Sequence, residues 1–196
     1  MKEYIRSVRI KSRKKDLEKI HWYATKCLNL KIELVSDEEM GTDAGGYIEP
    51  EDGKPGTITV SRNENPTQMI LVLIHEIGHH IDFLKRGYIQ EEHFAYGFYP
   101  EEIGKPCPPE YRAAITRMEE EAIKNSYELV TYLDLKIPEF TLIKDQLIMR
   151  NNLKYILQNG MNTKTWRRKN RQECHKQARK ILNEKRKRRK NCEFNQ

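Results

Sequence analysis

The longest apolar run of the chain is Met69–Ile74, and apolar residues continue beyond it at helical spacing. The dipeptide Asn65-Pro66 supplies a cap residue followed by proline at the first helical position, and Gly87 is a residue typical of helix C-termini. These signals predict a helix from about Pro66 to Arg86. Because its apolar residues cover more than one face, we expect it to lie at the centre of the core.

Periodic apolar positions predict three more helices, at about Lys14 to Asn29, Glu110 to Leu135 and Pro138 to Gly160. The stretch from Tyr88 to Pro109 has no periodicity, many aromatic residues and several prolines. We expect this stretch to be a packed loop near a cleft.

Three short segments have strand character: Ile32–Val35, Tyr47–Pro50 and Thr57–Val60. The second and third flank a turn rich in glycine, proline and aspartate, which is the composition of a β-hairpin. The sequence therefore predicts an α+β fold in which a small sheet or hairpin packs on the central helix.

The chain has 196 residues and a net charge of +7, but the charge is uneven. Residues 164–196 include 14 basic and 3 acidic residues. The part of the chain before residue 164 therefore has 36 − 14 = 22 basic and 29 − 3 = 26 acidic residues. We expect one domain over residues 1–162 and a basic C-terminal helix or disordered tail over residues 163–196. The basic segment fits either sequence-independent nucleic-acid binding or a solvated tail that aids solubility.

The four cysteines are far apart in sequence and form no CxxC pair. This spacing suggests neither a disulfide framework nor a cysteine zinc site, and it fits a reducing compartment. The charged N-terminus leads into no apolar signal segment, and no apolar run approaches membrane-spanning length. We expect a cytoplasmic protein with no membrane association, while the sequence leaves its oligomeric state open.

The predicted central helix carries His75, Glu76 and His79, the HExxH pattern of zinc metallopeptidases. On a helix, residues four apart share a face, so His75 and His79 can both bind one Zn²⁺ ion. Glu76 is placed as the base that takes a proton from water. Gly78 lets another element approach the metal side, and we expect His80 to have a packing or surface role.

The third ligand is less constrained by the pattern. Asp82 and Lys85 stand where the extended metzincin pattern needs glycine and histidine, so that class is excluded. The gluzincin arrangement takes its third ligand from a glutamate on a later helix, commonly next to an alanine. Glu121, which precedes Ala122, fits this pattern. Glu120 and His93 are the alternative third ligands. Asn125 and Asp82 are candidates for orienting the histidines.

These features resemble the ImmA/IrrE-type metallopeptidases. The resemblance rests on Gly46-Tyr47-Ile48, the segment Thr57–Val60, the stretch His75–His80 and the pair Glu121-Ala122. It implies a zincin-like fold with a gluzincin ligand set. It also implies an intracellular zinc protease that cleaves transcriptional repressors, so the substrate would be a DNA-bound regulator.

A second resemblance is to SprT-like proteases, which act on proteins at DNA and take a third histidine near the position of His93. The leading interpretation is a zinc-dependent endopeptidase that hydrolyses peptide bonds of an intracellular protein. The alternative is a non-enzymatic nucleic-acid-binding or scaffold protein whose zinc site is structural or vestigial.

Overall fold

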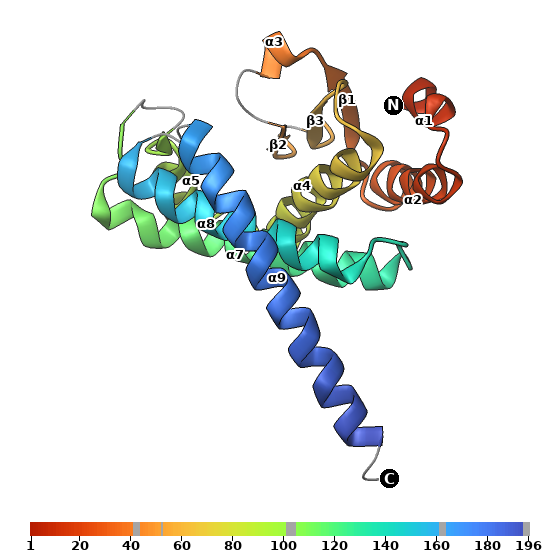
Figure 1. Ribbon diagram of the computed structural model, residues 1–196. Coiled ribbons are helices and arrows are strands. Elements are labelled where there is room, and N and C mark those ends of the chain that lie inside the picture. The colour runs from red at the N-terminus through yellow and green to blue at the C-terminus, as the bar shows by residue number, and fades with distance from the viewer. Residues whose placement is uncertain (41–43, 52, 101–104, 161–163, 194–196) are drawn as a thin grey trace. The chain divides into compact units, whose positions relative to one another are not determined.

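The computed structural model describes residues 1–40, 44–51, 53–100, 105–160 and 164–193 (Figure 1). The chain divides into two compact units. Unit 1 comprises residues 1–89 and 117–136, and unit 2 comprises residues 90–116 and 137–196. These boundaries differ from the border that we expected after residue 162.

Unit 1 combines helices with a small sheet, as the α+β prediction requires. Its elements are α1 (Lys2–Ser7), α2 (Lys11–Trp22), the π-helix η1 (Tyr23–Cys27), β1 (Lys31–Val35), α3 (Asp37–Met40), β2 (Gly45–Ile48), β3 (Thr57–Ser61) and α4 (Pro66–Arg86), together with most of α7 (Pro109–Tyr132). The helix predicted from Lys14 to Asn29 is thus α2 continued by a π-helical turn.

The sheet has three strands in the order β1-β3-β2. Strands β2 and β3 are antiparallel, with Tyr47 opposite Ile58, which confirms the predicted hairpin. Strand β1 pairs with β3 in parallel, with Ile32 opposite the same Ile58. Within the described chain, β2 therefore forms one edge of the sheet.

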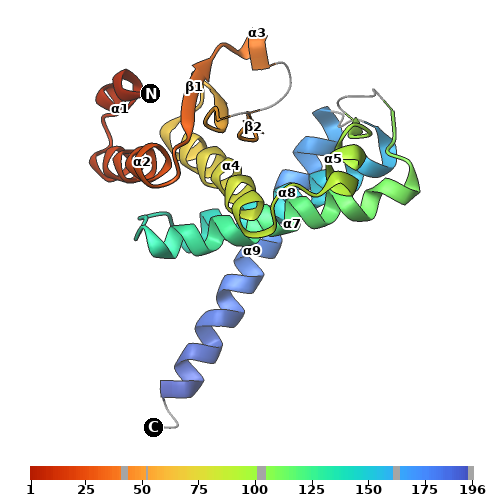
Figure 2. The same ribbon diagram turned by 180° about the vertical axis from the view of Figure 1, so that it is seen from behind.

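Helix α4 has the predicted bounds and the predicted central place. The Asn65 side chain accepts hydrogen bonds from the backbone N–H groups of Thr67 and Gln68, and Gly87 ends the helix at a φ of 71°. Met69, Ile70, Leu73 and Ile77 are fully buried. The helix contacts α2 as well as β2 and β3, so it forms the core between the sheet and a helical layer (Figures 1 and 2).

Unit 2 contains α5 (Gln90–Tyr96), the start of α7, α8 (Glu139–Asn159) and α9 (Lys164–Glu193). Its core consists of small and aliphatic side chains: Ala95, Cys107, Ala114, Ile115, Leu153 and Leu157. The stretch predicted as a loop from Tyr88 to Pro109 therefore includes a helix, and residues 101–104 within it lie outside the described part. The basic C-terminal segment is helical and packs on α8.

Polar side chains join α8 to α9 in a group that we call the asparagine cluster: Asn151, Asn152, Asn170 and Cys174. Asn151 Nδ2 donates to Asn170 Oδ1 at 3.0 Å, and Asn170 Nδ2 donates to Asn152 Oδ1 at 2.9 Å. The Cys174 thiol is fully buried and contacts both Asn151 and Asn170. Since buried polar groups are costly unless paired, this cluster specifies one register between the two helices.

No helix within the described ranges is both long enough and apolar enough to cross a membrane.

Candidate metal centre

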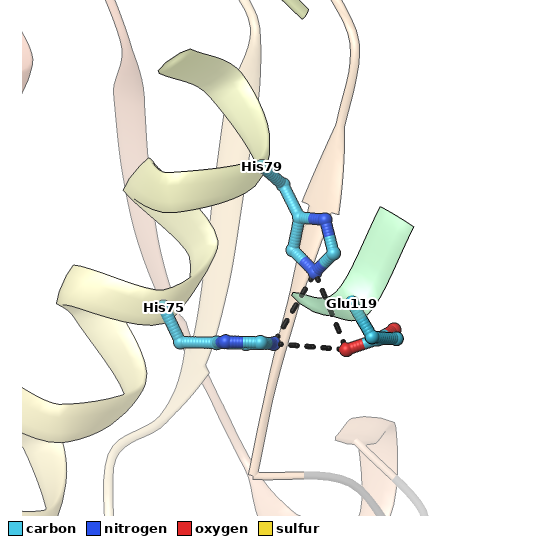
Figure 3. A group of neighbouring side chains, drawn as sticks. All are labelled: His75, His79 and Glu119. Atoms are coloured by element: carbon cyan, nitrogen blue, oxygen red, sulfur yellow. Dashed lines mark hydrogen bonds and ion pairs between the residues drawn. The ribbon is translucent and has the colours of Figure 1, made fainter. Parts of the chain in front are cut away.

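Three side chains of unit 1 converge on one point (Figure 3). His75 and His79 come from α4, and Glu119 comes from α7. The Nε2 atoms of the two histidines are 3.2 Å apart. Glu119 Oε2 lies 3.3 Å from His75 Nε2 and 3.8 Å from His79 Nε2. The three side chains are 13–16% exposed, so the group faces a partly closed site.

A close crossing of α4 and α7 brings Glu119 to the histidines. A Cβ atom built on Gly78 would lie 2.3 Å from the carbonyl oxygen of Ala122, so only glycine permits this approach. Asn125 Nδ2 donates to the Gly78 carbonyl oxygen at 3.0 Å and ties the two helices together beside the crossing. The prediction that Gly78 admits another element is therefore confirmed, and the element is α7.

The structure places Glu119, and not Glu121, beside the histidines. Glu119 precedes Ala122 by three residues, so both lie on the face of α7 that meets α4. Glu121 is rotated about 100° from Ala122, and its carboxylate pairs with Lys124 at 3.2 Å. Within the described chain, the metal-ligand group includes neither Glu120 nor His93.

A signal for Glu119 was present in the sequence. The buried residues Ile115, Ala122, Ser126 and Leu129 recur at spacings of three, four and seven residues along α7. Glu119 occupies the position that completes this stripe, so it is the acidic residue that the buried face carries toward α4.

The electrostatics favour the protonation states that bind metals. Burial lowers the pKa of His79 to about 4, with Glu119 opposing the shift. Burial acts to raise the pKa of Glu119, but His79 and His75 outweigh it and hold this pKa below its usual range. At neutral pH the group therefore presents a neutral His79 imidazole and a carboxylate, the forms that coordinate cations.

The distances also suit a metal ion. A tetrahedral ion with bonds of about 2.0–2.1 Å to nitrogen and oxygen places its ligand atoms about 3.3–3.4 Å apart. The three separations of 3.2, 3.3 and 3.8 Å are close to that value. Two imidazole nitrogens and one carboxylate oxygen can thus hold a metal ion with a coordination position left open.

Glu76 lies beside this group and is buried, with 8% of its surface exposed. A Cβ atom built on Gly45 would lie 3.3 Å from Glu76 Oε1 and 2.3 Å from Val72 Cγ1. The edge strand β2 therefore crosses α4 directly at Glu76, and the glycine makes this approach possible. The base candidate, which follows the ligand candidate His75 in sequence, is thus packed against the sheet edge.

His80 fixes β2 from the same helix. Its Nδ1 atom is 2.8 Å from the hydroxyl of Tyr47, and the ring is 2% exposed. Burial lowers the pKa of His80, with a hydrogen bond to the Leu28 backbone opposing the shift, and burial raises the pKa of Tyr47 above its ordinary value. A neutral imidazole that accepts from the phenol fits both shifts, and the expected packing role of His80 is confirmed.

The two residues predicted to orient the histidines have other contacts. Besides Gly78, Asn125 contacts Lys85, whose Nζ donates to Asn125 Oδ1 at 2.8 Å. The Asp82 carboxylate is bound by the Arg86 guanidinium, with Nε to Oδ1 at 2.7 Å. Asp82 reaches His79 through its charge, which opposes the lowering of the His79 pKa. Asn125 therefore holds α7 against α4, and Asp82 contributes a negative charge that acts on His79.

Comparison with known proteins supplies no relative: the chain matches no family model, no curated protein and no solved structure. The interpretation of the site rests on its own residues.

Proposed function

We propose that this protein is a zinc-dependent endopeptidase with a zincin-like fold, in which His75, His79 and Glu119 hold the metal. The observation that carries the proposal is the convergence of a carboxylate from α7 on two histidines spaced as in HExxH. A set of two histidines and one glutamate is the ligand set of a known group of catalytic zinc sites. In this proposal, Glu119 has the role that the sequence pattern suggested for Glu121.

The intact Glu76 favours a catalytic site over a structural one. Structural zinc sites close their coordination with four protein ligands and need no base, whereas the group found among the described residues offers three. Bound zinc would supply an activated water and a positive charge that polarises a carbonyl group. Glu76 would take the proton of the attacking water and deliver it to the leaving amine.

The edge strand β2 favours a peptide as the substrate. An extended peptide can pair with the free edge of a sheet, which orients its backbone without regard to most side chains. Because Gly45 of β2 lies against Glu76, a peptide on this edge would lie close to the base candidate. The partner in this proposal is therefore an extended segment of a protein.

The resemblance to ImmA/IrrE-type enzymes extends the proposal to a DNA-bound regulator as the protein that is cleaved. A glutamate as third ligand favours this resemblance over the SprT-like one, which needs a histidine in the role considered for His93.

Metal content is the first test. The wild type, Glu119→Gln and the matched control Glu121→Gln are purified, loaded with Zn²⁺, desalted and analysed by atomic emission. We expect one zinc per chain in the wild type and in Glu121→Gln, and a large loss in Glu119→Gln. Full retention of zinc by Glu119→Gln would contradict the ligand set.

Cleavage is the second test. Zinc-loaded wild type and Glu76→Gln are incubated with a peptide library prepared from a digested proteome, and new termini are identified by mass spectrometry. We expect cleavage sites that are present with the wild type and absent with Glu76→Gln, while both proteins keep their zinc. A zinc-loaded wild type that produces no new termini would refute the peptidase proposal and favour a binding protein.

A further inference from the structure

Helix α9 carries three groups of cations on the face that points away from α8. The face toward α8 is marked by Asn170, Cys174 and Ala178, which are buried. At 100° per residue, seven of the basic residues whose side chains the structure describes lie at least about 120° from Cys174. They are Arg168 and Lys169 near the start, Lys176, Arg179 and Lys180 in the middle, and Arg186 and Lys187 toward the end, and all seven are exposed. We call them the outer basic stripe.

The outer basic stripe contains no acidic residue, although the charge of Arg186 contributes to the lowered pKa of Glu139. Glu173 and Glu184 lie nearer than about 120° to Cys174 on the same helical projection, so they fall outside the stripe. Other cations of α9 are used inside unit 2, since Lys185 and Arg189 both pair with Glu139 at 2.8 and 4.0 Å. Within the described chain, none of the seven stripe residues takes part in an ion pair.

The length of the stripe suits an extended polyanion. From Arg168 to Lys187 it covers 20 residues, or 19 rises of 1.5 Å, which is about 28 Å. Duplex DNA carries one negative charge per ~1.7 Å of its axis, so a segment of this length offers far more phosphates than the stripe has cations. An α-helix also fits the major groove of B-form DNA, which is about 12 Å wide.

Other features of α9 indicate which kind of anionic partner the stripe suits. A helix that lies on a membrane needs an exposed apolar face, whereas the exposed large apolar residues of the described chain all lie outside α9. Single strands are held largely by stacking on aromatic side chains. The aromatic residue of α9, Trp166, already stacks on Tyr155 with ring centres 4.1 Å apart. Duplex RNA presents a major groove too narrow for a helix.

We propose that the outer basic stripe of α9 binds the phosphate backbone of duplex DNA without sequence preference. The stripe consists of lysine and arginine side chains, which bind phosphate groups. The interaction is therefore electrostatic and sensitive to salt. This inference does not depend on the metal or on the proposed peptidase activity.

Fluorescence anisotropy with the full-length protein tests the proposal. Labelled duplexes of about 20 base pairs in two unrelated sequences are titrated between about 50 and 200 mM salt. The stripe variant replaces Lys176, Arg179, Lys180 and Lys187 with Gln. The control variant replaces Arg6, Arg9, Lys11 and Lys15, four exposed cations of unit 1, with Gln and so has the same net charge. Circular dichroism verifies that both variants keep their helices.

We expect equal affinity for the two sequences, and an affinity loss of at least about tenfold in the stripe variant. The slope of log affinity against log salt should fall by up to about 3.6 in that variant, because each lost phosphate contact contributes about 0.9. The control variant should bind as the wild type does.

Several results would overturn the proposal: no binding by the wild type, or an equal loss in the control variant. Equal affinity for a single strand or for duplex RNA of the same length would overturn the assignment of duplex DNA. Equal or tighter binding to vesicles that contain phosphatidylserine would show that the partner is a membrane surface.

Discussion

The crossing of α4 over α7 at Gly78 offers a sharp test of how the site is built. Replacing Gly78 with Ala places a Cβ atom 2.3 Å from the Ala122 carbonyl oxygen, and ordinary contact begins at 3.4 Å. The neighbouring atoms are backbone and cannot rotate away, so relief requires the helices to separate by 3.4 − 2.3 = 1.1 Å. Glu119, three residues before Ala122 on the same helix, moves with them.

Two free-energy terms set the size of the effect. Overpacking costs about 1–3 kcal/mol, and the weakened hydrogen bond from Asn125 to Gly78 costs about 1 kcal/mol. Ala in place of Gly returns about 1 kcal/mol through helix propensity. We therefore expect Gly78→Ala to lower the free energy of unfolding by about 1–3 kcal/mol. Zinc affinity should fall at least about tenfold, because metal–ligand distances tolerate only about 0.2 Å.

The assays are urea unfolding of the metal-free protein and competition for Zn²⁺ with a chromophoric chelator. Gly97→Ala is the matched control, since a Cβ atom there meets its nearest neighbour, the Phe94 carbonyl oxygen, at 3.4 Å. The control should stay within about 0.5 kcal/mol of the wild type and keep its zinc affinity. A Gly78→Ala protein with the stability and zinc affinity of the wild type would refute the close helix crossing.

Three further predictions concern single interactions. Tyr47→Phe removes the hydroxyl that bonds His80 and should lower the free energy of unfolding by about 1 kcal/mol in urea titrations; an unchanged value would show that this bond does not hold β2. Asn170→Ala removes the hydrogen bonds that the buried Asn170 makes to the partly buried Asn151 and Asn152 and should cost about 1–3 kcal/mol by the same measurement, whereas a loss below about 0.5 kcal/mol would contradict the cluster. In the metal-free protein, stability should fall on acidification from about pH 6.5 to 4, because unfolded His79 takes up a proton that the folded residue, with a pKa of about 4, does not. The lowered pKa of Glu119 adds a further loss of stability as the pH falls below about 4.5. A free energy of unfolding that stays constant from about pH 6.5 to below about pH 4.5 would contradict both pKa shifts.

Local signals were sufficient to predict α4 from the sequence. Its cap at Asn65, its proline at the first position and its terminal Gly87 act within one turn of the helix ends, so they are readable without knowledge of the rest of the fold. The hairpin of β2 and β3 was predictable for the same reason, since its turn composition lies between the strands.

Contacts between distant segments were not readable in this way. Nothing local shows that β1 pairs with β3 in parallel, because that pairing depends on the path of the intervening chain. Glu121 was predicted as the third ligand because it is next to Ala122 in sequence. Neighbours in sequence do not share a helix face, whereas residues three apart do, and Glu119 is three residues before Ala122. Helix α5 is only seven residues long and lacked a periodic apolar pattern that could outweigh its aromatic, proline-rich surroundings.

The metal-ligand group also has a consequence for the chain as a polymer. Glu119 lies 119 − 79 = 40 residues after His79, so a bound ion would act as a removable cross-link that closes a long loop. By the chain-entropy relation for cross-links, closing a loop of this length is worth about 4 kcal/mol against the unfolded state. A chelator would then loosen the fold as well as remove the ion on which the proposed activity depends. The protein should accordingly be degraded faster by cellular proteases where zinc is scarce and more slowly where zinc is plentiful.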